Sequence, residues 1–454
     1  MVAIVATIIY GGAVFAPSPP NIPTAKLVPT CAVPNVVANI GALGPNVTGG
    51  VYVGPVGQAV TIPANVTMKL TQSLTIISSG NLDINGHIVP GLNAVGEVKN
   101  PSLNITLISQ QGSVNLGPNA VVGWAPGLLI PTAAPVTAAS SAGNAGRSGG
   151  YIKIVAPSGT VWNQGSIIGL SGEGGGSATD VVGNVLGFMS AAGGGGGHAG
   201  DVRLCHVDGI NNQGTIRGGF AGGGGGGIAT SVAGLADARG GPGGLGGDVI
   251  LEGLANPGPV RVLNPGGIFG GLGGEGGGGI ASTAAPWPFV ANADGARGRF
   301  GGTVKFVNVE MAPVGPLHNA SGGDGGVASA TGGPGLNLGV AGTKGGSATA
   351  KGGRGARDGV KALPIPVPPL DPPGVWGPTI TGLPSRTGTG GTATATAGGG
   401  GFGLFKNGAS GTANAVGGTG KGGVPPAPVP AFGPTPPVAA AGGAGGTVTA
   451  TGSP

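Results

Sequence analysis

Residues 149–155, which read GGYIKIV, form a strand-like block that returns three times further along the chain. The copies read AGDVRLC at 199–205, GGDVILE at 246–252 and GGTVKFV at 301–307. After each pair of small residues the apolar positions recur with a period of two, which predicts a β-strand. If the copies stack, these apolar positions form ladders inside. The opposite positions are then predicted to form a solvated basic ladder outside, made of Lys153, Arg203 and Lys305.

The spacing between copies is roughly 44–55 residues, which is typical of repeat architectures. An earlier copy is Ile105-Thr106-Leu107. Weaker later copies are the small-residue stretches 347–350, 392–396 and 447–450. A repeat that buries its apolar face only against its neighbours is the unit of a solenoid.

A second strand-like segment follows in two copies, as VWNQGSI at 161–167 and INNQGTI at 210–216. The shared Asn-Gln-Gly predicts a sharp corner, with Gly in a backbone conformation that other residues avoid. Asn163 would then stack on Asn212 in an amide ladder. Short strand-like segments also occupy residues 66–89. Together these patterns predict an all-β fold with a parallel β-solenoid core.

Glycine makes up 108 of the 454 residues and gathers between the strand blocks. The longest such segments are 172–200, 218–247 and 266–302, and the first contains an unbroken run at 193–197. Each segment returns the chain to the same strand position, which argues against a floppy linker. We therefore expect arms of extended threefold helices, of polyglycine-II type, whose N–H and C=O groups pair between neighbouring helices. Irregular packed loops are the alternative.

A strand, a corner with Asn-x-Gly, a second strand and a glycine-rich excursion together resemble the glycine-rich parallel β-helix proteins of microbial surfaces. This resemblance covers roughly residues 60–330. The arms are similar to the polyglycine-II sandwiches of some phage tail-fibre adhesins and of small glycine-rich antifreeze proteins. We divide the chain into an N-terminal strand and Pro-rich segment at 1–58, the solenoid with its glycine-rich insertions at 59–330, and a Gly-, Pro- and Thr-rich continuation of the repeats at 331–454.

The N-terminal apolar run is rich in β-branched residues, which favours a strand, and it is too short to span a membrane as a helix. We expect no transmembrane segment. The run could pair within its own sheet or act as a donor strand for a neighbouring subunit. The candidate donor residues are Val2, Ile4, Val5, Ile8 and Ile9. The two cysteines, Cys31 and Cys205, lie far apart, and Cys205 occupies an apolar strand position, so we interpret it as a buried free thiol.

Composition excludes several classes of protein. The abundance of Gly and of the 41 Pro argues against a helical fold. Charged residues are only 8%, the net charge is +5, and the densest basic stretch, 344–361, lacks interleaved aromatics, so we expect no nucleic-acid binding. The four histidines show no metal-ligand spacing and are expected in exposed turns, although His198 and His206 lie near Asp201 and Asp208. We expect neither a metal site nor a cofactor.

These features favour a non-enzymatic structural protein, extracellular or at the cell surface, that forms a filament or surface layer. Its main partner would be itself, through strand addition or the open solenoid ends. Two Pro-rich stretches, 363–378 and 425–437, are predicted to be external straps or contacts to another subunit.

Three alternatives stay open. A bacterial or phage-type adhesin would bind surface glycans through aromatic residues at the arm tips. The candidates for that role are Phe188, Phe220, Trp287 and Phe289. A polysaccharide-active β-helix enzyme would use the stacked carboxylates Asp201 and Asp248, which otherwise only open strands and pair with cations. Ice binding through flat threefold faces is the third.

Overall fold

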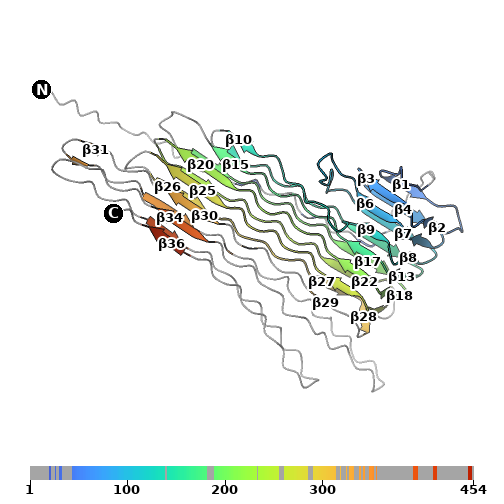
Figure 1. The fold of residues 1–454 in the computed structure, drawn as a ribbon. Helices are drawn as coiled ribbons and strands as arrows, with labels where there is room; N and C mark the ends of the chain where they lie inside the picture. The colour runs from blue at the N-terminus through green and yellow to red at the C-terminus, as the bar shows by residue number, and fades with distance from the viewer. Residues whose placement is uncertain are drawn as a thin grey trace, which may run out of the picture.

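The computed structural model of the chain describes residues 43–312 except 139–140, 181–188, 233, 255–259 and 285–289. It also describes short stretches on either side, namely 20–21, 26, 30–32, 317–318, 324, 327–331, 337–338, 341–342, 347–351, 354, 392–396, 413–416 and 448–451. A solenoid lies at one end of this part, two further sheets lie at the other end, and glycine-rich arms run between them (Figure 1).

Three parallel sheets form the sides of the solenoid. Sheet I contains β1 (Gly50–Val53), β4 (Leu74–Ser78), β7 (Ile105–Ser109), β12 (Ile152–Ala156), β17 (Val202–His206), β22 (Val249–Gly253) and β27 (Val304–Val307). Sheet II contains β2 (Val60–Ile62), β5 (Leu82–Ile84), β8 (Val114–Leu116), β13 (Thr160–Asn163), β18 (Gly209–Asn212), β23 (Val260–Leu263) and β28 (Val309–Ala312). Sheet III contains β3 (Thr67–Leu70), β6 (His87–Pro90), β9 (Val121–Gly123), β14 (Ser166–Ile168), β19 (Thr215–Arg217), β24 (Gly267–Phe269) and β29 (Leu317–His318).

The predicted register of the repeats is confirmed. Ile152 pairs with Val202, Val202 with Val249, and Val249 with Val304 along sheet I. These inward side chains, and the aliphatic ladders of the other two sheets, form one continuous core in which most members are fully buried. Because each fully buried aliphatic side chain contributes about 1.5–3 kcal/mol, the solenoid is stabilised mainly by these ladders.

The predicted amide ladder is also confirmed and extends one coil further. Asn163 Nδ2 donates to Asn212 Oδ1 at 2.7 Å, and Asn212 Nδ2 donates to Asn264 Oδ1 at 2.6 Å, all three side chains being buried. The reason given for the corner glycines is wrong, because Gly165 and Gly214 do not have positive φ. A Cβ at Gly214 would instead lie 1.9 Å from the carbonyl oxygen of Gly165, so glycine is needed because adjacent coils approach so closely.

After its sheet III strand, each longer coil leaves the solenoid along an outward arm, crosses the two distal sheets and returns along an inward arm (Figure 1). Sheet IV contains β10 (Val136–Thr137), β15 (Ala178–Asp180), β20 (Gly227–Ser231), β25 (Gly279–Thr283), β30 (Ala328–Thr331), β34 (Ala393–Thr396) and β36 (Val448–Thr451). Sheet V contains β11 (Ser141–Ala142), β16 (Met189–Ala192), β21 (Ala236–Arg239), β26 (Val290–Asp294), β33 (Ser347–Lys351) and β35 (Ala413–Val416). A short antiparallel pair, β31 (Asn337–Leu338) and β32 (Ala341–Gly342), completes the described strands.

Sheets IV and V pack face to face through a core of buried alanines with a single methionine, Met189. The weaker late copies of the repeat belong here and not to sheet I, which corrects their alignment with residues 151–155. Stretch 347–350 lies in β33 of sheet V, and 392–396 and 447–450 supply β34 and β36 of sheet IV. Their alternating Ala and Thr fit this sandwich because the methyl side chains allow two sheets to approach closely.

Candidate functional site in the glycine bundle and on the solenoid face

The arms form an ordered two-layer bundle of the polyglycine-II type. In the inward arm of 193–200, the acceptor of each N–H group depends on its position in a repeat of three residues. Two of the three positions donate to neighbouring arms. Those of Gly193, Gly196 and Ala199 donate to carbonyls of the next inward arm, at Arg239, Pro242 and Leu245, each at 2.8 Å. Those of Gly194, Gly197 and Gly200 donate to the outward arm in the other layer, at Gly176, Glu173 and Leu170, at 2.7–2.9 Å. The alternative of irregular loops is therefore wrong for the described arms.

The remaining third of the positions faces out of the bundle, and this explains a triplet pattern in the sequence that the period-two strand pattern does not reveal. Residues 240–248 read GGPGGLGGD, with Pro242, Leu245 and Asp248 at the outer positions. At inner positions a side chain has no room, since a Cβ at Gly222 would lie 2.0 Å from the carbonyl oxygen of Glu173. At the outer position Gly223 the nearest atom, the carbonyl oxygen of Glu275, is 3.9 Å away. Gly-Gly-X triplets are therefore the signal of this bundle.

Side chains at outer positions accept the outward N–H groups of the next arm. His198 Nδ1 accepts from the N–H of Leu245 at 3.0 Å, and Asp201 Oδ1 accepts from the N–H of Asp248 at 2.6 Å. Asp248 Oδ1 in turn accepts from the N–H of Thr303 at 2.8 Å. These side chains accept hydrogen bonds from main-chain N–H groups for which no neighbouring arm in the described part supplies a carbonyl.

Asp201 and Asp248 are stacked one coil apart, as the enzyme hypothesis requires, but both are ion-paired and hydrogen-bonded to the main chain. Lys26 Nζ lies 2.6 Å from Asp201 Oδ1, and Lys305 Nζ lies 2.6 Å from Asp248 Oδ2. Burial raises the pKa of Asp201, with Lys26 opposing this. Burial also acts against ionisation of Asp248, but Lys26, Lys305 and the Thr303 amide together lower its pKa. This arrangement supports the structural interpretation of the pair.

Three described sites near the N-terminus, Asn21, Lys26 and Cys31, contact this outer face of the bundle and the adjoining sheet I. The carbonyl of Asn21 accepts from the N–H of Gly195 at 2.8 Å, and Lys26 Nζ donates to the carbonyl of Gly246 at 2.9 Å. Cys31 forms a disulfide with Cys205, with the Cα atoms 5.8 Å apart. Described residues 21, 26 and 31 therefore contact the inward arm and its strand at residues 195, 201 and 205 in the same order.

The disulfide shows that the interpretation of Cys205 as a free thiol is wrong. Cys205 does lie in an apolar position, beside Ile77, Ile108 and Val155 on the outer face of sheet I, but Cys31 covers this cluster. Sequence distance was misleading because Asn21 and Lys26 are bound to the bundle on the side where Cys205 lies. Glu252 lies near both sulfur atoms, but two cysteines joined in a disulfide offer no thiolate ligands for a metal ion.

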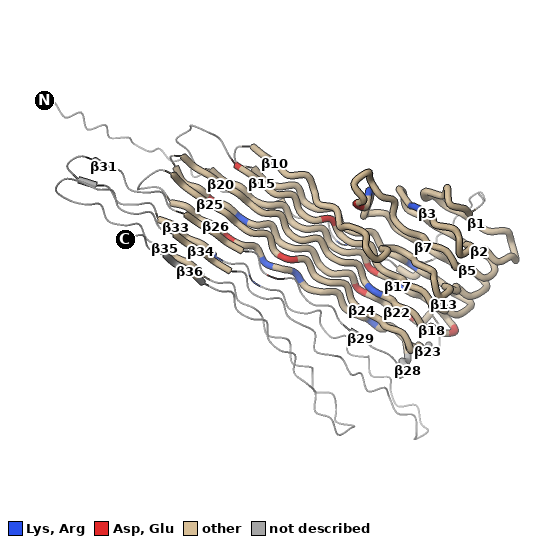
Figure 2. Tube along the Cα trace, in the orientation of Figure 1, with Lys and Arg blue, Asp and Glu red and all other residues tan. Residues whose placement is uncertain are grey.

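The same cover changes the predicted basic ladder. Lys153 is buried and donates to the carbonyl of Ala32 at 2.5 Å, so it is not solvated. Its pKa is lowered by burial and by the charge of Arg203. Arg203 pairs with Glu252, and Ile250 occupies the ladder position between Arg203 and Lys305. Charged residues are sparse over the whole described part (Figure 2).

The histidines do not form a metal site in the described residues. His206 was expected in an exposed turn but is fully buried in β17, where burial lowers its pKa to about 4. His198 is bound to the bundle main chain, and burial, Arg299 and Lys26 lower its pKa. Asp208 is exposed on another face.

Only one of the four aromatic candidates for arm tips falls in the described residues. Phe220 lies at the base of an outward arm, half-buried against the solenoid core, with the Arg217 guanidinium carbon 5.3 Å from its ring centroid. It is therefore not an exposed tip. Outside the described residues lie Phe188, Trp287, Phe289, the Pro-rich stretches 363–378 and 425–437, and the candidate donor strand with Val2, Ile4, Val5, Ile8 and Ile9.

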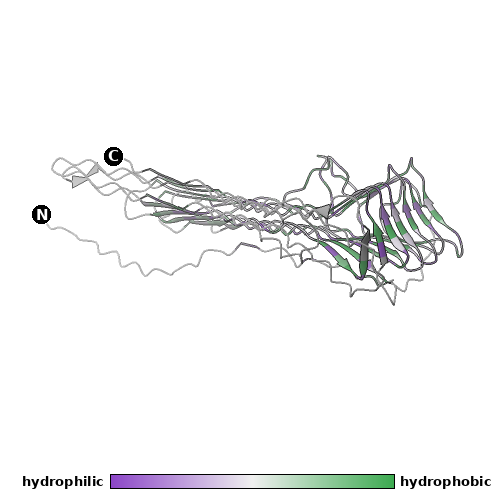
Figure 3. Cartoon of the chain, turned by 90° about the horizontal axis from the view of Figure 1, so that it is seen from below, coloured by the Kyte–Doolittle hydropathy of each residue, from purple (hydrophilic) through white to green (hydrophobic). Residues whose placement is uncertain are grey.

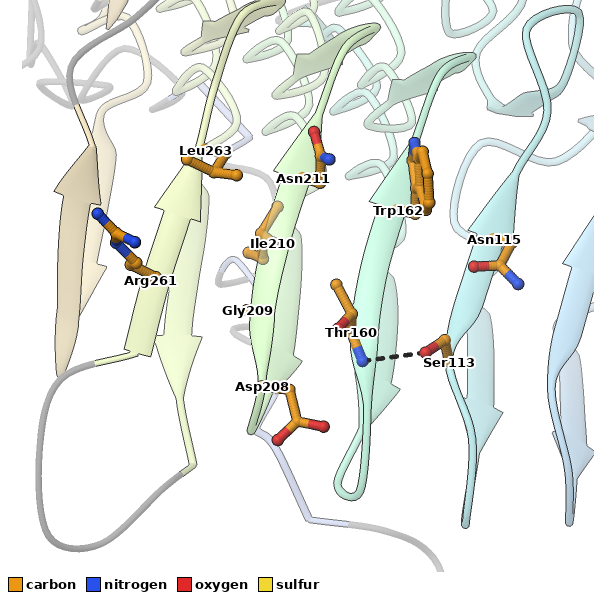
Figure 4. Close-up of a pocket in the computed structure, with 10 residues that line it drawn as sticks. All are labelled: Ser113, Asn115, Thr160, Trp162, Asp208, Gly209, Ile210, Asn211, Arg261 and Leu263. Atoms are coloured by element: carbon orange, nitrogen blue, oxygen red, sulfur yellow. Dashed lines mark hydrogen bonds between the residues drawn. The ribbon is translucent and has the colours of Figure 1, made fainter.

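The most exposed tryptophan of the described residues lies instead on the outer face of sheet II (Figure 4). Trp162 is 44% exposed and stands beside a hollow of about 390 Å³. The hollow is lined by Ser113, Asn115, Thr160, Trp162, Asp208, Gly209, Ile210, Asn211, Arg261 and Leu263. The period of two could have identified Trp162, because it alternates with the inward residues Val161 and Asn163.

Each stack of strands ends in a strand with a partner on one side only, among the residues that the structure describes. In sheet IV the end strands are β10 and β36, and in sheet V they are β11 and β35. Because all neighbouring strands in these sheets are parallel, one end presents the complement of the other. These ends are candidate assembly surfaces.

No helix in the described part of the chain is long and apolar enough to cross a membrane. Comparisons with protein-family models, with curated proteins and with solved structures found no match to this chain.

Proposed function

We propose that the protein is a non-enzymatic extracellular structural protein, the subunit of a self-assembling filament or surface layer. The observation that carries this proposal is that, among the described residues, each end strand of sheets IV and V has a partner on one side only, and the two ends of each sheet are complementary. A parallel stack that ends in an unpaired strand can accept the first strand of another copy, and head-to-tail contacts of this kind generate open-ended filaments.

Three other features support this proposal. The bundle and the alanine sandwich form a slab in two layers, whose arms are neither strongly hydrophobic nor strongly hydrophilic (Figure 3). Sparse charge leaves little repulsion between copies. The disulfide between Cys31 and Cys205 fits an oxidising, extracellular setting. The likeness of the arms to polyglycine-II sandwiches of phage tail-fibre adhesins suggests a related mechanical role, as a stiff extended element.

Electron microscopy of the purified full chain over a range of concentrations tests this proposal. We expect filaments or sheets at high concentration. A variant that lacks residues 1–16 distinguishes the routes of assembly, since loss of filaments assigns the contact to the N-terminal strand and their persistence assigns it to the sheet ends. Discrete monomers at high concentration for both proteins contradict the proposal.

A further inference from the structure

We propose that the outer face of sheet II binds a neutral polysaccharide chain, with a sugar ring stacked on Trp162. This inference concerns a different face from the stack ends and does not rest on assembly. It follows from the order of side chains across the strands, from the hollow beside Trp162 and from the charge of its lining.

A polar row crosses sheet II with Trp162 at its centre. In strand register, Asn115 of β8 pairs with Trp162 of β13, which pairs with Asn211 of β18. On the far side of Asn115, its Nδ2 donates to Asp83 Oδ1 at 2.7 Å, which fixes the orientation of that amide. Amide side chains offer both hydrogen-bond donors and acceptors, as sugar hydroxyls do.

The hollow beside this row exists because of a glycine. In the adjacent row, Thr160 pairs with Gly209, and Arg261 of β23 follows. Gly209 has φ +146° and no side chain, so the row drops to the main chain between Thr160 and Arg261 (Figure 4). Asp208 stands at the lower end of the hollow and the exposed Leu263 at its upper side. A ligand group can therefore sit below the level of the indole.

The chemistry of the lining selects among ligands. Asp208 and Arg261 balance each other in charge, so the hollow has no excess of cations to hold a phosphate backbone. Asn, Ser and Thr surround a single exposed indole, whereas a site for a folded partner protein usually buries several apolar anchors. A pyranose ring presents an apolar face to an aromatic ring and hydroxyls at its rim, which matches this lining. The open row across parallel strands suits an extended chain of such rings.

Isothermal titration calorimetry with two neutral β-linked probes, cellohexaose and chitohexaose, tests the site on the full-length protein. We expect at least one probe to bind. Trp162→Ala should weaken that binding about tenfold or more, because a central tryptophan in a binding site accounts for a large share of affinity. Asn211→Ala should weaken it by a smaller factor, and Trp162→Phe should keep part of it.

Phe300→Ala is the matched control, because Phe300 is 49% exposed but belongs to the glycine bundle. It should bind like the unchanged protein. Circular dichroism of every variant shows whether the fold is kept, and Asn211→Ala tests the site independently if Trp162→Ala does not fold. The proposal is overturned if neither probe binds, or if binding is unchanged in the folded Trp162 and Asn211 variants.

Discussion

Replacing Gly222 with alanine is expected to destabilise the bundle strongly, whereas the same change at Gly223 is not. The new Cβ at position 222 would lie 2.0 Å from the Glu173 carbonyl oxygen, against a normal carbon–oxygen contact of roughly 3.3 Å. The two arms must therefore move apart by roughly 1 Å. At position 223 the nearest atom is 3.9 Å away, so no movement is needed.

The magnitude follows from the hydrogen bonds that this movement weakens. Hydrogen bonds join these two arms: the N–H of Gly172 donates to the Phe220 carbonyl at 2.8 Å, and the N–H of Gly175 donates to the Gly223 carbonyl at 2.8 Å. A buried main-chain group left without its partner costs about 1–3 kcal/mol, so we expect a loss on the order of 2–5 kcal/mol for Gly222→Ala. Gly223→Ala should change the free energy of unfolding by no more than about 1 kcal/mol, and in the stabilising direction if the reduced freedom of the unfolded chain dominates.

Denaturant unfolding followed by circular dichroism measures both variants under the same conditions. The two glycines are neighbours in one run of six, so propensity and local composition are matched. Equal effects of the two substitutions would refute the reasoning, because only the three-residue alternation of the bundle distinguishes the two positions.

The remaining predictions concern side chains and disulfide chemistry. Peptide mapping without reductant should recover Cys31 linked to Cys205, and Cys205→Ser should cost up to about 5 kcal/mol by loop entropy, given the sequence separation of 174 residues; a free thiol on either residue contradicts this. Because the pKa of His206 is about 4 in the fold and 6.5 in the unfolded chain, only the unfolded chain takes up a proton between these values. Stability should thus fall by on the order of 3 kcal/mol as the pH drops from 6.5 to 4, and denaturation midpoints of His206→Leu should lack this slope. Asn212→Ala should cost on the order of 3 kcal/mol because its buried amide partners lose their hydrogen bonds, whereas Gln213→Ala, on the exposed ladder beside it, should cost under about 1 kcal/mol; similar midpoints for the two would contradict the ladder's role.

The solenoid could be predicted from the sequence because large side chains mark its positions. Ile152, Val202, Val249 and Val304 fix the register, and Asn163 and Asn212 fix the corner. The four aliphatic side chains have a burial preference strong enough to set which way their strands face, and the repeated Asn-Gln-Gly marks the corner.

The distal sandwich could not be predicted in the same way, because its strands carry almost no distinguishing side chains. Alternation of Ala with Thr at 392–396 fits sheet I and sheet IV equally well. A strand joins sheet IV and not sheet I because it lies at the far end of an arm. The path of that arm depends on main-chain hydrogen bonds between glycines. The triplet pattern of 240–248 was present in the sequence, but its meaning requires the three-residue alternation of partners.

The prediction of a free thiol at Cys205 was wrong for a related reason. Cys31 reaches Cys205 because residues 21 and 26 are bound to the outer face of the bundle. That face consists of N–H and C=O groups and a few side chains such as Asp201, which leave no hydrophobic pattern to match. Side-chain periodicity therefore cannot predict that a segment binds to the main chain of the bundle.

Native-state hydrogen exchange of the glycine amides, resolved residue by residue by nuclear magnetic resonance, tests most directly whether main-chain pairing holds the arms together. We predict slow exchange for Gly222, Gly224 and Gly225, whose N–H groups donate to neighbouring arms. Gly223, for which the described residues supply no main-chain acceptor, should exchange much faster. Fast exchange at all four positions would contradict the ordered bundle.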